Sequence, residues 1–354
     1  MMVIENRNEW NKILEEEFDN FDDIYFRYEY SELYRKHYSV YPEAIFWEDK
    51  NIKVFLVHLI RKISSEINSK LGSYCDLVTP YGYGGPLVIK KTDINEKGVK
   101  KSVTEFYRSY IKYCSDNNYV SEFIRFHPIF GNQRYFKNIL NVEYVNDVVV
   151  INLKQNLKDI LFNVKKGHRY NARKTIREGC EVLITVKPKK SDVSDFIGCY
   201  YDMLDRNNSQ KKYYFPPQFI RDHFELFDSV MIKVTHMDVC VGAAIFIAGS
   251  SILHYHLSGS FKIKGIYPTD LIILEAIKWA KERGFKYLHL GGGRGRNDSL
   301  FKFKSGFSNI YKKFYIGKLI FSERVYNKLV RLAGVNPDVK FFPAYRAKLN
   351  DTIV

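Results

Sequence analysis

The chain has 354 residues, of which 45% are hydrophobic and 27% are charged, and this balance is ordinary for a folded globular protein. The length predicts two domains, and no run of about 18 apolar residues occurs that would predict a membrane-spanning helix. The formal net charge of +15 favours a polyanionic partner, such as nucleic acid, a nucleotide-linked sugar or an anionic membrane surface. A basic protein without such a partner would show the same composition.

The cysteines and the first residues of the sequence predict the cellular location of the protein. Five cysteines lie far apart and form no Cys-x-x-Cys pair, which favours free thiols in a reducing environment over a disulfide framework. The start MMVIENRNEW has neither the basic segment nor the apolar core of a secretory signal. We therefore expect a cytoplasmic protein. Because the sequence has no cysteine pair and no His-Glu-x-x-His motif, we expect no metal site.

The first half of the chain predicts a domain of mixed helices and strands. Apolar spacing predicts helices at residues 10–18, 28–37 and 99–117, and strands at residues 52–63 and 122–126. Lys36 lies at the end of the second helix, where a cation either satisfies helix carbonyls or meets an anionic ligand. The segment YGYGGP has glycines that permit positive φ. It is either a bulged strand or a groove wall in which Tyr81 and Tyr83 face a ligand.

A basic segment follows the expected domain junction, which is a strand at residues 144–153 without a Gly-, Ser- or Pro-rich linker. Residues 156–179 predict one helix with an apolar face and a basic face at spacings of three and four. The basic face consists of Lys166, Arg169, Arg173 and Arg177. Such a face is either solvated or contacts the phosphate backbone of a nucleic acid.

The second half predicts a sheet with helices packed against it. The predicted strands are residues 182–187, 228–236, 239–248, 250–260 and 287–290, and the predicted helices are residues 193–206 and 268–283. Lys211 and Lys212 precede three aromatic residues, which indicates either a basic loop or a site that binds phosphate or stacks on a base. His254 and His256 alternate along one strand and are either core residues or candidate bases.

The most informative stretch is YLHLGGGRGRNDSLFKFKSGFS, from Tyr287 to Ser308. A short strand runs into Gly291, Gly292 and Gly293, which allow close approach of backbone or ligand, and Arg294 follows. A strand edge, a glycine-rich opening and cations suit an anionic or carbonyl-bearing substrate. The alternative is a glycine-rich turn with solvated cations.

These motifs resemble a known family. The order strand, helix, strand, glycine loop over residues 250–293 resembles the C-terminal half of the GNAT acyltransferase fold. The segments HLSGS, EAIKWAKERGFKYLHLGGGRG and LFKFKSGFS resemble its Fem branch, as do DLVTPYGYGGPL and HRYNARKTIREG. The Fem branch comprises aminoacyltransferases that form peptidoglycan bridges, together with the relatives of these enzymes. The resemblance covers roughly residues 20–320, and the order of elements in residues 74–128 repeats that of residues 250–293.

The resemblance implies an α+β protein with two tandem GNAT-like domains, mixed sheets flanked by helices, and no helical-arm insertion. Domain 1 would span residues 1–150, bind the acceptor and be completed by the C-terminal tail. Domain 2 would span residues 151–320 and hold the acyl donor and the catalytic residues. Residues 321–354 would form a C-terminal helix and tail.

The family's activity implies roles for individual residues. Lys304 would stabilise the reacting carbonyl with Phe303 beside it, and His256 or His254 is a candidate base, although the family does not require one. The residues implied to bind the donor are Gly291, Gly292, Gly293, Arg294, Lys262 and Lys264. Those implied to bind the acceptor and its phosphates are Lys36, Tyr81, Tyr83, Lys211 and Lys212. Those implied to bind tRNA are Lys166, Arg169, Arg173 and Arg177.

The implied reaction transfers an aminoacyl group from aminoacyl-tRNA to an amine of a peptidoglycan precursor, with no further cofactor required. The partners would be tRNA and a nucleotide- or lipid-linked cell-wall precursor. Peripheral contact with the inner face of the membrane is a further possibility, and no stable protein partner is expected. One alternative is an acyl-CoA-dependent N-acyltransferase acting on an amino sugar of an envelope polysaccharide. Another is a non-catalytic relative that binds RNA or the envelope. Tyr267 and Pro268, at the place where CoA-using GNAT enzymes present amides to pyrophosphate, disfavour acyl-CoA.

Overall fold

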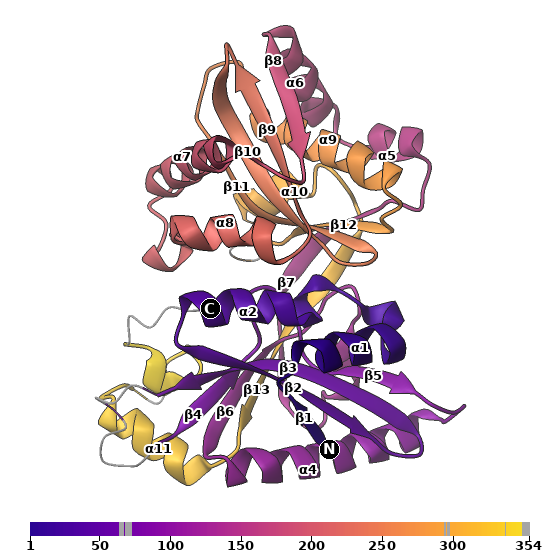
Figure 1. The fold of residues 1–354 in the computed structure, drawn as a ribbon, viewed down its shortest axis with the longest axis vertical. Helices are drawn as coiled ribbons and strands as arrows, with labels where there is room; N and C mark the ends of the chain where they lie inside the picture. The colour runs from indigo at the N-terminus through magenta and orange to yellow at the C-terminus, as the bar shows by residue number, and fades with distance from the viewer. Residues whose placement is uncertain (64–66, 68–72, 294, 296–297, 337, 349–354) are drawn as a thin grey trace. The chain divides into compact units, whose positions relative to one another are not determined.

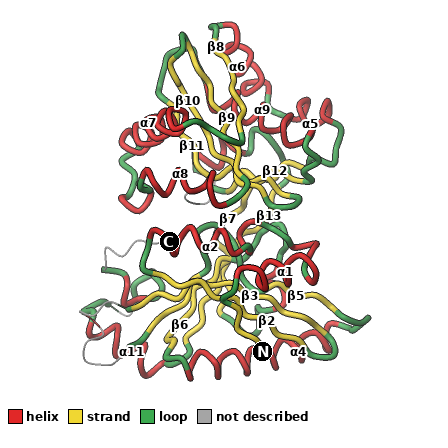
Figure 2. The backbone as a smooth tube through the Cα atoms, viewed as in Figure 1, coloured by secondary structure: helices red, strands yellow, loops and turns green. Residues whose placement is uncertain are grey.

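The computed structural model describes residues 1–63, 67, 73–293, 295, 298–336 and 338–348. The chain forms two compact units, of which the first comprises Met1–Val145 and Lys313–Val354, and the second comprises Asn146–Lys312. Each unit is a mixed sheet flanked by helices (Figure 2), which confirms the expected α+β class. The second unit ends at Lys312, whereas the sequence suggested residue 320. Among the described residues, no helix is long and apolar enough to cross a lipid bilayer.

The sheet of the first unit has the order β1–β2–β3–β4–β6–β13, and β5 pairs with β3. Figure 1 shows α1 and α2 on one face of this sheet and α4 and α11 on the other. The strands are β1 (Met2–Ile4), β2 (Val40–Glu48), β3 (Ile52–Lys62), β4 (Cys75–Val78), β5 (Leu87–Lys90), β6 (Tyr119–Arg125) and β13 (Tyr311–Ile320). The helices are α1 (Arg7–Glu17), α2 (Tyr28–His37), α4 (Glu96–Asp116) and α11 (Glu323–Leu332).

The sheet of the second unit has the order β7–β12–β11–β10–β9–β8. Figure 1 shows α7 and α8 on one face and α6 and α9 on the other. The strands are β7 (Asn141–Asn152, joined to β12 through Val149–Asn152), β8 (Cys180–Thr185), β9 (Ser229–His236), β10 (Val239–Ala248), β11 (Ile252–Ser260) and β12 (Tyr287–Gly291). The helices are α5 (Leu157–Asn163), α6 (Lys166–Arg177), α7 (Lys190–Arg206), α8 (Pro217–Leu226), α9 (Pro268–Glu282) and α10 (Ser299–Lys304).

Residues 156–179 form two helices, so the prediction of one continuous helix is wrong. Helix α5 ends before Val164, and both Val164 and Lys165 have extended backbone angles. The side chain of Val164 is buried in the core of the second unit. The amide of Lys165 donates to the carbonyl oxygen of Gly306 over 2.8 Å. The break therefore ties the start of α6 to the turn that follows α10.

A strand–helix–strand arrangement with parallel strands occurs in both units, in agreement with the repeated order in the sequence. In the first unit β4 and β6 are parallel and α4 lies between them in sequence, and in the second unit β11, α9 and β12 have the same relation. The pairing of β11 with β12 ends at His254 and His289, although β11 continues to Ser260. The pairing of β4 with β6 ends at Val78 and Phe123. The two parallel pairs are therefore short.

A buried charge network fixes the C-terminal segment to the first unit. Asp76 is fully buried, and its carboxylate accepts from Arg61 Nε over 2.8 Å and from Arg346 Nε over 2.6 Å. The hydroxyl of Tyr345 donates to the same carboxylate over 3.0 Å. Burial alone would raise the pKa of Asp76, but the charges and hydrogen bonds of the two arginines outweigh burial and lower it.

We expect Asp76→Asn to lower the free energy of unfolding at pH 7 by about 3–5 kcal/mol, because two buried guanidinium groups lose their shared counter-charge. Because folding lowers the pKa of Asp76, the stabilisation is present above its unfolded pKa of about 4 and is lost as the pH falls. Urea denaturation at pH 7 and pH 4 measures both effects. The control is Asp93→Asn at an exposed position, and equal stability of the two variants would contradict the prediction.

Candidate active site

The candidate site lies where β11 and β12 separate in the second unit. Beyond His254, β12 no longer pairs with β11. One strand further, the register between β10 and β11 shifts, because Ile245 pairs with Leu257 while Phe246 pairs with Tyr255. His256 is therefore the extra residue of a β-bulge, which interrupts the hydrogen-bond ladder at that point. The separation and the bulge together leave strand backbone of β11 available to a ligand.

Lys304 projects from α10 to this point. Its Nζ donates to the carbonyl oxygen of Gly292 over 2.8 Å and lies 5.8 Å from the ring centroid of Tyr255. Burial lowers the pKa of Lys304 to about 8, and the carboxylate of Asp298 acts in the opposite direction. Within the part of the chain that the structure describes, no carboxylate forms an ion pair with this ammonium. A buried, oriented cation of this kind can stabilise an oxyanion.

The glycine loop and the start of α10 fix the position of Lys304. Asp298 caps α10 by accepting from the amide of Phe301 over 2.8 Å and from that of Gly295 over 3.0 Å. A Cβ on Gly293 would lie 2.0 Å from Asp298 Oδ1, and one on Gly292 would lie 2.9 Å from a main-chain oxygen. Close packing therefore requires the glycines, and their direct contact with a donor stays a prediction. Arg294 lies outside the described residues.

A histidine–aspartate pair holds the turn after α10. His168 Nδ1 lies 2.6 Å from Asp270 Oδ1, which joins the first turns of α6 and α9. The imidazole stacks on Phe307 at 4.3 Å between centroids and meets Phe303 edge-on at 5.1 Å. A Cβ on Gly306 would lie 2.0 Å from His168 Nε2. Phe303 is therefore a packing neighbour of this pair, and its direct contact with substrate stays a prediction.

The sequence did not single out His168, Asp270 and Asp298 as site residues. His168 lies within the helix for which the sequence predicts an apolar face, and Asp270 lies in the first turn of a helix, where an acidic residue complements the helix dipole. The signal for Asp298 was its place just before an apolar–basic helix, where aspartate is a favoured cap. No local pattern predicts the contact of His168 with Asp270, because 102 residues separate them.

The two histidines on β11, His254 and His256, lie near other histidine side chains. The ring of His256 lies 5.1 Å from that of His223 on α8, and His254 Nδ1 lies 3.1 Å from His289 Nδ1 on β12. Burial, and then the neighbouring His223 and His254, lower the pKa of His256 well below 6.5. His256 is therefore neutral at pH 7 and has the protonation state that a base requires.

The loop before α9 uses its polar groups internally. The amide of Tyr267 donates to Thr175 Oγ1 over 2.8 Å, and Pro268 has no amide hydrogen. The carboxylate of Asp270 lies in the first turn of α9, where it occupies the positive end of the helix dipole. Lys262 and Lys264 are exposed. Two of the backbone positions at this helix terminus, Tyr267 and Pro268, therefore have no amide hydrogen to offer a pyrophosphate.

The basic residues of α6 lie on an exposed surface with aromatic rings. Lys166, Arg173 and Arg177 are exposed and Arg169 is partly exposed. The guanidinium of Arg169 lies 5.8 Å from the ring centroid of Phe162, and that of Arg177 lies 5.9 Å from Tyr170. Phe162 is 74% exposed and Tyr170 is 57% exposed. The surface thus offers both charge and stacking faces.

The predicted acceptor residues belong to both units. In the first unit Lys36 is exposed at the end of α2, and the carbonyl oxygen of Tyr81 accepts from the Tyr30 hydroxyl over 2.6 Å. Tyr83 packs edge-on against Tyr25, at 5.4 Å between ring centroids. In the second unit the predicted residues Lys211 and Lys212 lie on a short 3₁₀ turn.

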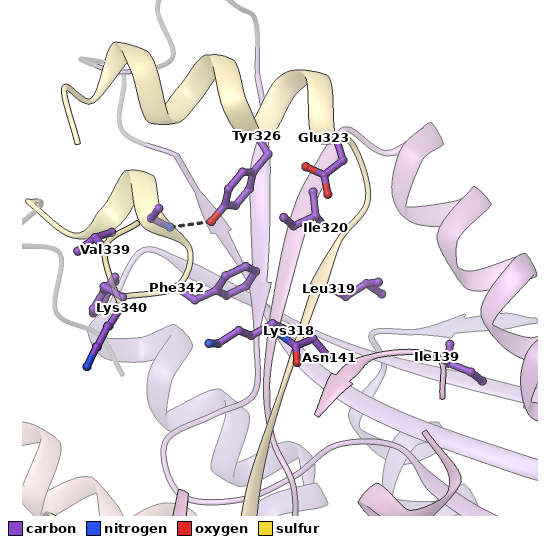
Figure 3. A pocket seen from close by; sticks show the side chains of 12 residues that line it. Ile139, Asn141, Lys318, Leu319, Ile320, Glu323, Tyr326, Val339, Lys340 and Phe342 are labelled. Carbon is purple, nitrogen blue, oxygen red and sulfur yellow. Dashed lines mark hydrogen bonds between the residues drawn. The ribbon is translucent and has the colours of Figure 1, made fainter. Parts of the chain in front are cut away.

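A separate pocket of about 480 Å³ lies in the first unit between β13, α11 and the C-terminal segment (Figure 3). Lys318, Tyr326 and Phe342 are among its lining residues. None of the residues predicted for the active site lines this pocket. It therefore has no part in the candidate site.

Comparison with solved structures gives the class of fold, whereas no family profile and no curated protein sequence matches this chain. The crystal structure of FemX matches with a TM-score of 0.66 and 11% identity over 92% of this chain and 99% of that one. L-PGS from Bacillus licheniformis matches with a TM-score of 0.56 and 13% identity over 93% and 97% of the two chains. These similarities show that the chain has the same kind of fold as FemX and L-PGS, as the Fem-type resemblance predicted.

We expect Lys304→Met to raise the free energy of unfolding at pH 7 by about 1–2 kcal/mol, because it removes a buried charge without an ion pair. Folding lowers the pKa of Lys304 from 10.5 to about 8, so the wild-type chain gains stability between those pH values and the variant does not. Denaturation at pH 7 and pH 10 measures the change. Lys302→Met, at an exposed position on the same helix, is the control, and destabilisation by Lys304→Met would contradict the prediction.

Proposed function

We propose that the chain is a Fem-like N-acyltransferase that transfers an aminoacyl group from aminoacyl-tRNA to an amine of a cell-wall precursor. The observation that carries the proposal is the buried ammonium of Lys304, oriented by the Gly292 carbonyl where β11 and β12 separate. An acyl group placed along the free edge of β11 would direct its carbonyl oxygen toward a cation. Similarity of the fold to FemX supports the same class of reaction.

The proposed reaction needs only groups that the chain and its substrates supply. The acceptor amine attacks the ester carbonyl carbon, a C–N bond forms, and the C–O bond to the ribose of the tRNA breaks. Lys304 stabilises the negative charge that develops on the carbonyl oxygen. The proton that the amine loses leaves with the ribose oxygen. His256 is the candidate base for this transfer, although burial lowers its pKa well below 6.5 and so disfavours its protonated form.

Two observations favour a tRNA donor over acyl-CoA. At the start of α9 the amide of Tyr267 is bonded to Thr175, and Asp270 places a carboxylate in the first turn, which disfavours a pyrophosphate there. The exposed cations and rings of α5 and α6 suit a nucleic acid, because phosphates bind cations and bases stack on aromatic rings. The glycines of residues 291–293 and the cations Lys262 and Lys264 complete the proposed donor site.

The proposed acceptor is a nucleotide- or lipid-linked precursor in the cytoplasm. In the first unit, Lys36 would bind phosphate, and Tyr81 and Tyr83 would contact the body of the precursor. In the second unit, Lys211 and Lys212 are separate candidates for binding phosphate. Exposed lysines bind phosphate as point charges. Tyrosine offers a ring and a hydroxyl at the same position, which suits a substrate with both sugar and peptide parts.

We expect Lys304→Ala to lower kcat by about 100- to 1,000-fold, the effect of removing one oxyanion donor. Affinity for tRNA should stay unchanged, because Lys304 is buried in the interior of the site rather than on the surface of α6. Release of deacylated tRNA from charged tRNA, in the presence of a nucleotide-linked muropeptide, measures turnover. The control is Lys302→Ala, and full activity of Lys304→Ala would show that the catalytic assignment is wrong.

A plot of log affinity for tRNA against log salt has a negative slope. We expect Arg169→Ala with Arg173→Ala to reduce the magnitude of this slope by roughly 1.5, since each lost phosphate contact reduces it by about 0.7–0.9. Binding is measured with and without acetyl-CoA. Lys97→Ala with Lys100→Ala, on the exposed surface of α4, removes the same charge elsewhere. An unchanged slope excludes the surface of α6 as the tRNA contact, and displacement of tRNA by acetyl-CoA would favour acyl-CoA as the donor.

A further inference from the structure

Arg125 occupies the place in the first unit where β4 and β6 separate. The amide of Thr79, just past β4, donates to the Phe123 carbonyl over 3.1 Å. The next hydrogen bond between the two strands involves a side chain: the amide of Arg125 donates to Thr79 Oγ1 over 3.0 Å. The chain rejoins β6 at the bridge between Gly84 and Phe126. Residues 80–83 therefore leave the sheet beside Arg125.

The guanidinium of Arg125 has few partners for its charge. Its Nη1 lies 3.5 Å from the Thr79 carbonyl oxygen, at the limit of a hydrogen bond, and its Cζ lies 4.7 Å from the ring centroid of Phe123. Among the described residues, no carboxylate lies within ion-pair distance of it. Arg61, by contrast, is paired with Asp76. Most of the five donors of Arg125 are thus unused.

The surroundings of Arg125 keep it away from bulk water. Burial, and then the charge of Arg61, lower the pKa of Arg125 to about 10. The residue nevertheless keeps partial exposure. A cation in this position remains protonated at pH 7, and it is costly to hold without a counter-ion. Strongly perturbed charges that a ligand can reach are typical of binding sites.

Tyrosines, rather than acids, surround this cation. The hydroxyl of Tyr30 on α2 donates to the Tyr81 carbonyl oxygen over 2.6 Å and lies 3.3 Å from the hydroxyl of Tyr34. Burial raises the pKa of Tyr34, and the positive charge of Arg125 acts in the opposite direction. The tyrosines are therefore neutral at pH 7. Neutral tyrosines cannot neutralise the guanidinium.

We propose that Arg125 is an oxyanion-binding residue of the first unit, which receives a carboxylate or phosphate group of the acceptor. A planar guanidinium binds either group through two parallel hydrogen bonds. The two sources are the terminal carboxylate of a peptide and the phosphate of a carrier. The identity of the acceptor rests on the proposed function, whereas the binding of an oxyanion does not.

Calorimetric titration with pyrophosphate and with succinate tests the binding itself. The wild-type chain should bind at least one of them saturably. Arg125→Gln should bind it about 10- to 100-fold more weakly, the usual effect of losing a charged hydrogen-bond donor. Arg134→Gln removes the same charge from an exposed position of the first unit and should bind as the wild type does. Binding of pyrophosphate alone indicates a carrier phosphate, and binding of succinate alone indicates a carboxylate.

Absence of saturable binding, or equal affinity of the wild type and Arg125→Gln, would overturn the proposal. If Arg125→Gln does not fold, Arg125→Lys carries the test, since it keeps the charge and removes the planar fork. We expect Arg125→Lys to bind at least threefold more weakly than the wild type. With a nucleotide-linked muropeptide as acceptor, Arg125→Gln should raise KM at nearly constant kcat. Anion binding without any acyl transfer would reject the proposed function and retain this site.

Discussion

The separation of two parallel strands is the constraint on which the candidate site depends. A parallel pair that stays in register leaves no room between its strands, whereas β11 and β12 stop pairing after His254 and His289. Several contacts then converge on the opening. Asp298 begins α10, the Gly292 carbonyl orients the ammonium of Lys304, and the His168–Asp270 pair holds the following turn. Each contact fixes the direction of one cation, so the site is organised before any substrate arrives.

Buried charges in this chain fall into two groups with different consequences for stability. Asp76 is surrounded by Arg61, Arg346 and the Tyr345 hydroxyl, so its charge is compensated within the fold. Among the residues that the structure describes, the hydrogen-bond partner of Lys304 is a carbonyl oxygen, and no carboxylate pairs with it. Holding such a cation lowers stability. The two buried charges therefore differ in whether the fold provides a counter-ion.

The sequence predicted features that depend on local pattern. The bounds of α2, the α9 helix and the repeated strand–helix–strand order all follow from residue spacing and helix caps. Strand β2 was missed, because Pro42 lies within it and proline argues against a strand. The break at Val164 was missed because it depends on a bond from Lys165 to the distant Gly306. The motif that resembles the Fem branch led to the prediction of Lys304, whose role stays a prediction, whereas the contacts of Asp270 and Arg125 depend on residues far along the chain.

Each unit has a cation near the end of a parallel strand pair: Arg125 is the last residue of β6, and Lys304 on α10 bonds to the Gly292 carbonyl just past β12. Burial lowers the pKa of Lys304 to about 8. The lysine is therefore charged at pH 7, but a change of charge on a neighbouring atom can alter its protonation state. Burial also acts on Arg125, but its pKa stays at about 10, so it remains a cation throughout the physiological range. A lysine suits a site where charge develops during a reaction, and an arginine suits one where a fixed anion must be held. The two residues therefore differ in how readily their charge responds to a neighbouring group.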